Sequence, residues 1–485
     1  MKTPHSEIDT YRYQEVEKHI MTMVTSGALG LDDKLPSLRS LSNNLNVSIS
    51  TVNQAYIELE HKGVIESRPR SGFFVRQESR RLPRTKTSPT PMEGPRPVTR
   101  SGLIQTVLEA VGRADSVPLG VVAPGESLLP LKEMARITAS VIKSDPWRAL
   151  RYAPIPGDPE LIRQIAFRSM EHGIPTNLDD PLITAGCMEA LYLSLRSVCR
   201  RGDTVLIQSP TYYCFLQLLE TLGLRAIEVP SDPETGVSPN ELKRALQTFD
   251  ISACVLAPNF NNPDSSLTPD ETKKEIVTML ARHDIPLIED DVSTDLHFGN
   301  KRPGTYKQFD TKGLVLLCSS FSKTIAPGFR VGWMLPGRFR QKVLEIKATT
   351  NVSTSSPAQM AISEYLRQGR MERHLKKLRG ALEKQMDTMQ LHLGRHFPEG
   401  TKVTHPRGGA ILWLELPKNI DSVELFFQAR AKSIGIVPGA IFSTQDKFTN
   451  YIRISCGFPW SEQIHKGIRT LGEMASNMTK NEHMA

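Results

Sequence analysis

A proline-rich stretch at residues 77–100 limits how this chain can fold more than any other feature. Its prolines are Pro83, Pro89, Pro91, Pro95 and Pro97. Such a stretch has few apolar residues, so it buries no core of its own and favours an extended, semi-rigid conformation. We therefore predict a multidomain protein with a small N-terminal module over residues 1–76 and a large module over residues 115–480. A proline-rich basic linker over residues 77–114 would join them.

Charge is concentrated near this stretch. The chain carries a formal net charge of +8. Residues 34–76 hold six Lys or Arg against three Asp or Glu, and residues 77–100 hold six against two. Residues 1–33 are acidic, and residues 101–485 are nearly balanced, with 45 basic against 41 acidic side chains. A basic region beside a small module indicates a nucleic-acid partner.

Two classes of protein are disfavoured by the composition. No run approaches the roughly 18 to 20 apolar residues of a membrane span, and the start MKTPHSEIDT lacks the apolar core of a signal peptide. We therefore expect a cytoplasmic location. The six cysteines are scattered, without a C-x-x-C pair or a Cys/His ligand spacing. Reduced thiols are favoured over a zinc site or a disulfide framework, so no metal is expected.

The small module contains the pattern of a winged helix-turn-helix. Apolar residues recur at helical spacing over residues 8–27, where Gly27 ends the pattern. A second helix can begin at Ser37, and a third near Ser48, with only the segment NLNVS between them. Two short helices across so tight a turn form a helix-turn-helix. The following segment VIESRPRSGFFV predicts two strands around a turn, which is a wing.

The third helix carries the side chains that we expect to contact DNA. Its early exposed face offers short hydrogen-bonding groups suited to base edges and phosphates, namely Ser48, Ser50, Thr51, Asn53 and Gln54. Arg39, Arg68 and Arg70 would flank this face and meet phosphates. The alternative is a three-helix protein-interaction module with a solvated polar face.

The segment KLPSLRSLSNNLNVSISTVNQAYIELEHKGVIESRPRSGFFV resembles a GntR-type winged helix. The LPS-x-R opening, the V-S-x-x-T-V start of the recognition helix and the S-G-F-F-V wing carry the resemblance over about 70 residues. It implies double-stranded DNA as a partner. Family members often have Arg after the first Ser of the recognition helix, whereas this chain has Ile49. A cationic contact is therefore lost, and no operator sequence can be carried over.

In the large module, helix-like stretches alternate with short apolar runs. The runs include PLITAG, DTVLIQS, CVLAP, IPLIEDD and GLVLLCSSFS. This alternation predicts an α/β fold with a largely parallel sheet covered by helices. Ligands of such sheets bind at the carboxyl ends of the strands.

Three of these strand ends carry chemistry. The first passes through Gly186 directly into a helix, an arrangement that favours a phosphate but also simply starts helices. The second places Glu289, Asp290 and Asp291 together, which indicates either a solvated loop or a site for a cation such as a protonated pyridine nitrogen. The third places Lys323 in a turn of small residues, where a desolvated amine beside a fixed cation can form a Schiff base. A phosphate cradle, an acid and an amine together are what pyridoxal 5'-phosphate requires.

Residues 115–480 resemble a fold-type I, class I aminotransferase domain, a PLP-dependent transferase fold. Behind a GntR-type winged helix, this domain makes the whole chain similar to MocR-type transcriptional regulators. The resemblance implies that Lys323 bonds covalently to the cofactor and that Asp290 keeps its ring nitrogen protonated. It assigns Asn262 to the ring hydroxyl and Tyr212 to stacking on the ring. Arg453 matches the arginine that binds a substrate α-carboxylate; the alternative is a surface arginine on a strand.

The phosphate contacts also follow from the resemblance. They are Gly186, Cys187 and Met188 through the helix start, Ser320 and Arg330 through side chains, and Tyr152 from the neighbouring subunit. Two departures from the family bear on the chemistry. Val292 and Ser293 occupy the positions where the family usually has a Tyr bonded to the ring hydroxyl, and Ser265 replaces the glycine of the usual NP-x-G.

Three functions remain open from the sequence. The leading hypothesis is a homodimeric transcription regulator that senses an amino compound, or PLP itself, and alters its binding to an operator. The rival is an active aminotransferase with an auxiliary DNA-binding domain, which the missing Tyr disfavours. A third reading, a PLP-free scaffold, conflicts with the joint presence of Lys323, Asp290 and Arg330.

Overall fold

The computed structural model describes residues 12–25, 28–30, 33–68, 71–76, 82–86, 92–99, 101–111, 113 and 115–481. The chain forms two compact units. The smaller comprises Met1–Leu82 with Asp387–Phe397, and the larger comprises Pro83–Met386 with Pro398–Ala485. Within the described residues, no helix is long and apolar enough to cross a lipid bilayer. The six cysteines are free, and four of them are buried.

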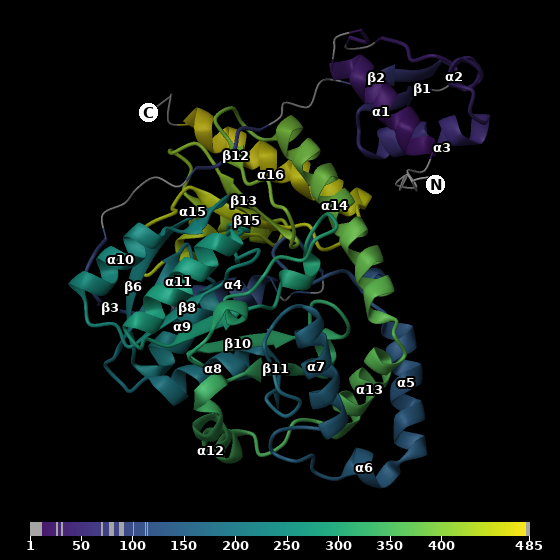
Figure 1. Ribbon diagram of the computed structural model, residues 1–485. Helices are drawn as coiled ribbons and strands as arrows, with labels where there is room; N and C mark the ends of the chain where they lie inside the picture. The colour runs from purple at the N-terminus through teal and green to yellow at the C-terminus, as the bar shows by residue number, and fades with distance from the viewer. Residues whose placement is uncertain are drawn as a thin grey trace, which may run out of the picture. The chain divides into compact units, whose positions relative to one another are not determined.

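The N-terminal unit contains a three-helix winged helix-turn-helix, drawn in purple in Figure 1. Its elements are α1 (Arg12–Thr25), α2 (Leu38–Leu45), α3 (Ile49–His61), β1 (Ile65–Arg68) and β2 (Gly72–Val75). Ser37 caps α2 and Ser48 caps α3, each accepting a hydrogen bond from a backbone N–H three residues on. Strands β1 and β2 are antiparallel. The predicted winged helix is confirmed, while Ile8 and Gly27 lie outside the described residues.

One cluster of buried side chains holds this unit together. It joins Ile20 of α1, Leu41 of α2, Tyr56 of α3 and Ile65 of β1. The hydroxyl of Tyr56 donates to the backbone oxygen of Pro36 at 2.7 Å, so the buried ring also fixes the start of α2. The period of the apolar residues thus predicts the faces that meet in the core.

The segment predicted as an extended linker differs from that expectation within its described residues. Arg84 forms a β-bridge with Val403, and the short strand β3 (Arg96–Pro97) pairs antiparallel with β6 (Arg225–Asp232). Residues 101–111 then form helix α4 (Ser101–Val111). Its apolar side chains at helical spacing, among them Ile104 and Val107, are buried in the large unit. The prolines that indicated a linker lie only in residues 77–100. They say nothing about residues 101–111, whose apolar side chains form a buried helix face.

A nine-stranded sheet forms the centre of the large unit (Figure 1). Its order is β3-β6-β5-β8-β9-β10-β11-β4, with β7 paired to β6. The strands are β4 (Leu182–Thr184), β5 (Thr204–Ser209), β6 (Arg225–Asp232), β7 (Gly236–Val237), β8 (Ala253–Leu256), β9 (Leu287–Asp290), β10 (Val315–Ser320) and β11 (Gly332–Leu335). The five neighbouring strands β6-β5-β8-β9-β10 are parallel. Strand β11 is antiparallel to both of its neighbours. The predicted α/β class with a largely parallel sheet is confirmed.

Helices cover this sheet and build two main cores. The helices are α5 (Leu131–Ser144), α6 (Pro146–Leu150), α7 (Pro159–Glu171), α8 (Cys187–Val198), α9 (Tyr213–Leu222), α10 (Pro239–Thr248), α11 (Asp270–Arg282), α12 (Arg340–Thr350), α13 (Ser356–Arg367) and α14 (Met371–His396). Side chains of α10 and α11 pack with those of β5, β6 and β8 in one cluster. Side chains of α5, α7 and α13 pack with β4 and the turn after β10 in the other.

A four-stranded antiparallel sheet follows in the C-terminal part. It has the order β12-β13-β15-β14, with strands β12 (Lys402–Val403), β13 (Ile411–Glu415), β14 (Val437–Pro438) and β15 (Tyr451–Ser455). Helices α15 (Ser422–Ala431) and α16 (Glu462–Asn481) accompany it. In the middle strand β15, Arg453 lies opposite Trp413 on one side and Val437 on the other. A central position of this kind buries the arginine.

Candidate functional site

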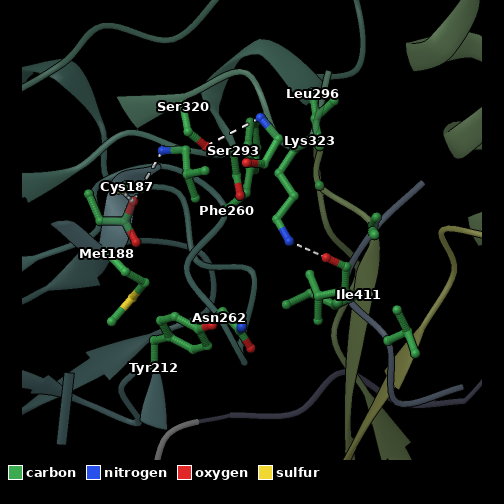
Figure 2. Close-up of a pocket in the computed structure, with 18 of the residues that line it drawn as sticks. Cys187, Met188, Tyr212, Phe260, Asn262, Ser293, Leu296, Ser320, Lys323 and Ile411 are labelled. Carbon is green, nitrogen blue, oxygen red and sulfur yellow. Dashed lines mark hydrogen bonds between the residues drawn. The ribbon is translucent and has the colours of Figure 1, made fainter. Parts of the chain in front are cut away.

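A pocket of about 390 Å³ lies at the carboxyl ends of the parallel strands. Eight of the residues predicted for the cofactor line it: Cys187, Met188, Tyr212, Asn262, Asp290, Ser320, Lys323 and Arg330. Figure 2 shows the Lys323 side chain extending into the pocket, with Cys187 and Met188 across from it. Tyr212 and Asn262 lie at another edge of the same space. Residues from five separate segments of the sequence therefore converge on one cavity.

Lys323 follows β10 in a turn of small residues. Its Nζ donates a hydrogen bond to the backbone oxygen of Val122 (Figure 2). The pKa of this amine is lowered to about 8, mainly by burial and also by the neighbouring cations Arg453 and Arg330, while Asp290 opposes the shift. An amine with this pKa is partly neutral near pH 7 to 8, so it can act as a nucleophile.

The three adjacent acids at the end of β9 do not share one environment. Glu289 is buried away from the pocket, where its carboxylate accepts hydrogen bonds from the backbone N–H groups of Tyr306 and Lys307 at 2.7 and 2.9 Å. Asp291 pairs with Arg302 at 3.1 Å. Of the three, Asp290 alone lines the pocket. Alternation along the strand turns the Asp290 carboxylate toward the pocket and those of Glu289 and Asp291 away from it.

Asp290 is held in place but has no cation paired with it among the described residues. Its Oδ1 accepts from the Val292 N–H at 3.2 Å and from the Cys187 thiol at 3.5 Å. Burial raises the pKa of this carboxyl to about 6, and the two hydrogen bonds oppose the rise. A buried acid of this kind gains a partner when a protonated ring nitrogen approaches it.

A candidate anion site lies at the start of α8. Gly186 precedes this helix with φ +86° and ψ 173°, a combination that only glycine adopts readily. A Cβ at this position would lie 2.4 Å from Nη2 of Arg330, so the guanidinium packs directly against the glycine. Arg330 also donates to the Ser322 hydroxyl at 3.3 Å. Free N–H groups of a helix start, a guanidinium and hydroxyls are a donor set that fits a phosphate.

Arg453 lies beside this pocket and is 1% exposed. It donates from Nη1 to the Asn262 side-chain oxygen at 3.0 Å and from Nη2 to the Gly120 backbone oxygen at 2.5 Å. Its guanidinium carbon also lies 5.9 Å from the Tyr213 ring centre. The structure therefore excludes the alternative of a surface arginine. A buried guanidinium facing only neutral oxygens in the described structure is suited to a carboxylate.

The two departures from the family pattern have different structural consequences. Val292 and Ser293 both line the pocket, and neither supplies a phenol to the ring hydroxyl. Ser265 adopts φ +56°, the left-handed conformation for which the usual glycine is suited. Its hydroxyl donates to the Ile411 backbone oxygen at 3.0 Å, which compensates for the strained backbone. Ser265 thus adopts a conformation open to glycine, whereas Val292 and Ser293 leave the ring hydroxyl without a phenol partner.

Tyr152 lies outside the pocket. Its side chain is 85% exposed, and it follows two other exposed apolar residues, Trp147 at 75% and Leu150 at 77%. Nothing in the described residues brings its hydroxyl to the Lys323 pocket of the same chain. This placement is compatible with the expected role across a subunit interface.

The predicted DNA-contacting residues are placed on the winged helix as follows. Arg39, Ser50 and Gln54 are exposed, and Thr51 and Asn53 are half-buried. Ser48 is exposed but occupied as the cap of α3, through its 3.1 Å hydrogen bond from the Thr51 N–H. Gln54 donates to Glu58 at 3.1 Å. Among the residues predicted to contact DNA, Ser48 therefore serves as a helix cap, whereas Arg39, Ser50 and Gln54 face outward.

Arg68 of the wing makes contacts within its own unit. The Arg68 Nε donates to Glu66 at 2.7 Å, and its guanidinium carbon lies 4.4 Å from the Phe74 ring centre. Arg68 is thus oriented by its own wing. Arg70 lies outside the described residues.

Sequence reasoning missed several residues of the pocket. Ser322 bonds Arg330, and its place next to Lys323 was a local signal that could have found it. Leu108 and Val111 of α4 and the backbone of Val122 also line the cavity. They precede Cys187, the first predicted residue that lines the pocket, by more than 60 residues, and no spacing in the sequence links them to the site.

Comparisons with known proteins identify a family for each of the two modules. The family model of aminotransferase class I and II matches residues 125–471, and that of bacterial regulatory proteins of the gntR family matches residues 12–75. The chain is 36% identical to the uncharacterized HTH-type transcriptional regulator YjiR of Escherichia coli (strain K12), over 95% of this chain and 98% of that relative. It is 35% identical to a second such regulator of that strain, YdcR, over 96% and 98%.

A solved structure shows the same fold in the large unit. LysN, the alpha-aminoadipate aminotransferase of Thermus thermophilus, complexed with N-(5'-phosphopyridoxyl)-L-leucine, is 27% identical with a TM-score of 0.72. The match covers 78% of this chain and 95% of that one.

Proposed function

The chain belongs to the aminotransferase class I and II family and carries a GntR-family winged helix at its N-terminus, and from this we propose that it is a DNA-binding transcriptional regulator of the MocR type. Its large unit binds pyridoxal 5'-phosphate and senses an amino compound, or the cofactor itself. The convergence of Lys323, Asp290 and Arg330 on one pocket carries this proposal. A regulator of this kind acts where the chromosome is, so we place it in the cytoplasm.

The residues of the pocket fit the cofactor group by group. The N–H groups after Gly186, the Ser320 hydroxyl and the Arg330 guanidinium would hold the phosphate. Asp290 would pair with the ring nitrogen, Asn262 would bond the ring hydroxyl, and Tyr212 would stack on the ring. When bound, pyridoxal phosphate supplies an aldehyde that captures amines and a ring that withdraws electrons. Lys323 is the amine placed to hold that aldehyde.

Arg453 gives the site a way to report an effector. A ligand carboxylate that pairs with Arg453 competes with the backbone oxygen of Gly120, which now occupies Nη2. Gly120 belongs to the segment that follows α4, and Leu108 and Val111 of α4 line the same pocket. Ligand-bound and ligand-free chains would therefore differ at Gly120 and at the end of α4, in the N-terminal part of the large unit. Such a difference between two states is what a ligand needs in order to shift DNA affinity.

We infer a homodimer. The exposed apolar side chains Trp147, Leu150 and Tyr152 supply a surface that a second copy can cover. In such an isologous contact, Tyr152 of one copy can serve the phosphate of the other. Two winged helices per dimer would also match paired half-sites on DNA.

The proposal is tested by selecting genomic DNA fragments with the full-length protein, with and without PLP and candidate amines. We expect enrichment of a paired-half-site sequence whose yield changes with one class of amine. Absorbance in the visible cofactor band, lost in Lys323→Ala, tests the cofactor separately. A colourless wild-type protein after incubation with PLP would contradict the cofactor assignment, and absence of any enriched sequence would contradict the regulator.

The second candidate is an active aminotransferase. The joint presence of Lys323 and the buried Arg453 favours it, whereas Val292 and Ser293 supply no phenol to tune the cofactor. Incubation with an amino acid and an oxo acid separates the two functions. Sustained formation of the new amino acid beyond one equivalent per subunit would establish the enzyme.

A further inference from the structure

A second pocket of about 190 Å³ lies in the large unit and shares no lining residue with the Lys323 pocket. Its walls come from the ends of β5 and β6, from the C-terminal sheet, and from residues 85–86 ahead of α4. The turn that follows Asn262 contributes Asp264. Nothing in the proposed function uses this pocket.

Asp264 is the unusual group in its lining. The residue is 1% exposed. Its Oδ1 accepts hydrogen bonds from the Asn261 side chain at 2.7 Å and from the Ser266 N–H at 3.1 Å. Its Oδ2 is buried and has no hydrogen-bond partner within the described structure. Burial raises the pKa of this carboxyl to about 6, and the hydrogen bonds from Ser266 and Asn261 oppose the rise, so near neutral pH it is a buried, incompletely compensated negative charge.

A second buried polar atom faces the same space. Thr85 is 7% exposed, lines the pocket, and its hydroxyl oxygen has no partner in the part of the chain that the structure describes. Buried hydroxyls and carboxylates are almost always hydrogen-bonded in folded proteins. Two such atoms in the lining of one cavity indicate that something else supplies their partners.

The other lining residues define the chemistry of that partner. Lys447 and Lys86 bring positive charge to the pocket, Lys447 lying 3.5 Å from the buried carboxylate of Glu228 and Lys86 being exposed. Trp413 and Tyr451 supply an aromatic wall, with ring centres 5.2 Å apart. Aromatic faces attract alkylammonium cations, which a carboxylate then neutralises. Lysines attract an anionic group.

We propose that this pocket is a binding site for a small zwitterion, with its alkylammonium group at Asp264 and the aromatic wall and its anionic group at Lys86 and Lys447. Binding at this site does not depend on the proposed function, because it involves neither Lys323 nor Arg453 nor DNA. Along the chain, however, the site adjoins residues of the Lys323 pocket and the segment that follows the winged helix. Asp264 is two residues from Asn262, which bonds Arg453, and Lys86 lies in the segment that follows the winged helix.

Glycine betaine is the probe that tests this site. Its quaternary nitrogen has no hydrogen to lose, so it cannot bond to the aldehyde of the cofactor. Pairing of its carboxylate with Arg453 is a separate event, which the variants of the second pocket distinguish. We expect saturable binding to the full-length, PLP-loaded protein, with a dissociation constant on the order of 1 mM or below by calorimetry. The visible absorbance of the cofactor should show no loss of the Lys323 bond. Wild-type protein that binds no betaine would overturn the proposal.

Two matched probes separate the two charges. 3,3-Dimethylbutanoate (tert-butylacetate) has the shape and carboxylate of betaine but carbon in place of the cationic nitrogen. Choline keeps the cation but lacks the carboxylate. We expect each to bind at least tenfold more weakly than betaine. Equal binding of tert-butylacetate would overturn the role of Asp264, and equal binding of choline would overturn the role of the lysines.

Variants locate the site. Asp264→Asn keeps the Oδ1 acceptor but removes the charge, and should weaken betaine binding at least tenfold. Asp179→Asn, at an exposed acid outside the lining, should leave it unchanged. Lys86→Gln, at an exposed position, should weaken betaine but not choline. Melting temperature and cofactor absorbance report folding; if Asp264→Asn fails to fold, the Lys86→Gln variant and the two probes still decide. Unchanged betaine binding in Lys86→Gln would contradict the assignment.

Discussion

The Arg453 guanidinium donates a hydrogen bond to the Asn262 side-chain oxygen at 3.0 Å. The residue expected to bind a ligand carboxylate is thereby joined to the residue expected to bond the cofactor hydroxyl. A carboxylate that moves Arg453 must also change the hydrogen bonding of Asn262. Ligand binding in the proposed regulator would therefore alter the absorbance of the cofactor even before any bond to it forms.

Replacing Arg453 should separate recognition of the carboxylate from recognition of the amine. In Arg453→Lys, the bidentate fork is lost, and the affinity for amino acids should fall by about 2 kcal/mol or more. The affinity for the corresponding amine without a carboxylate should change little. Spectral titration of the PLP-loaded protein measures both. Arg430→Lys, at an exposed arginine, is the control. Equal losses for the amino acid and the amine would show that Arg453 serves the fold and not the ligand.

The low pKa of Lys323 predicts how cofactor attachment depends on pH. Below about pH 8 the amine is protonated and cannot attack, and above it the neutral form dominates. The rate at which the cofactor-free chain attaches PLP should therefore rise with pH to a midpoint near 8. Stopped-flow absorbance measures this rate. In Arg453→Gln, loss of a neighbouring cation should move the midpoint upward. A midpoint above about 10, as for an ordinary lysine, would contradict the desolvated environment.

The pKa of Asp290 predicts that the affinity for PLP also depends on pH, here through a carboxyl group rather than an amine. Its carboxyl has a pKa of about 6, so it is protonated below that pH and charged above it. The attraction between this carboxylate and a protonated ring nitrogen is lost as the pH falls through about 6. Equilibrium dialysis of PLP between pH 5 and 8 should show affinity falling at the acid end. Asp290→Asn should bind PLP more weakly and lack this step. An identical step in the variant would assign it to another group.

The predictable parts of this molecule are those whose signals are local. Ser37 and Ser48 mark the starts of their helices because a cap acts within three residues, and Lys323, Asp290 and Gly186 stand at strand ends that hydrophobic runs mark. The separation of Glu289 and Asp291 from the pocket follows from strand geometry, but the sequence does not say which side of the strand is open. Leu108 of α4 joins the site from a distant part of the chain. The helical spacing of the apolar residues marks a helix there, but it does not say which part of the large unit that helix meets.

Gly186 offers a test of the phosphate end of the site. Alanine there would carry a strained backbone, costing about 1 to 3 kcal/mol, and its methyl group would lie 2.4 Å from Arg330 Nη2. Gly186→Ala should therefore lose both thermal stability and at least tenfold in PLP affinity. Gly202→Ala is the matched control, since Gly202 has φ +93° with nothing within 4 Å of the new methyl group. It should lose stability alone. Equal PLP affinity in the two variants would contradict the assignment of Arg330 to the cofactor phosphate.

Helix α3 separates residues that hold the fold from residues that meet DNA. Ser48 caps the helix, so Ser48→Ala should lower the stability of the winged helix by about 1 kcal/mol. Gln54 is exposed and its side-chain amide donates to Glu58 one turn further along the same helix, so Gln54→Ala should leave the melting temperature nearly unchanged. If α3 lies in the major groove, Gln54→Ala should weaken binding to the selected operator by about 1 to 3 kcal/mol and leave binding to random DNA nearly unchanged. Electrophoretic mobility shift with both DNAs, at one fixed salt concentration, measures the difference. Loss of affinity in equal proportion for the two DNAs would mean that Gln54 contacts the backbone and that another face of the winged helix carries the sequence preference.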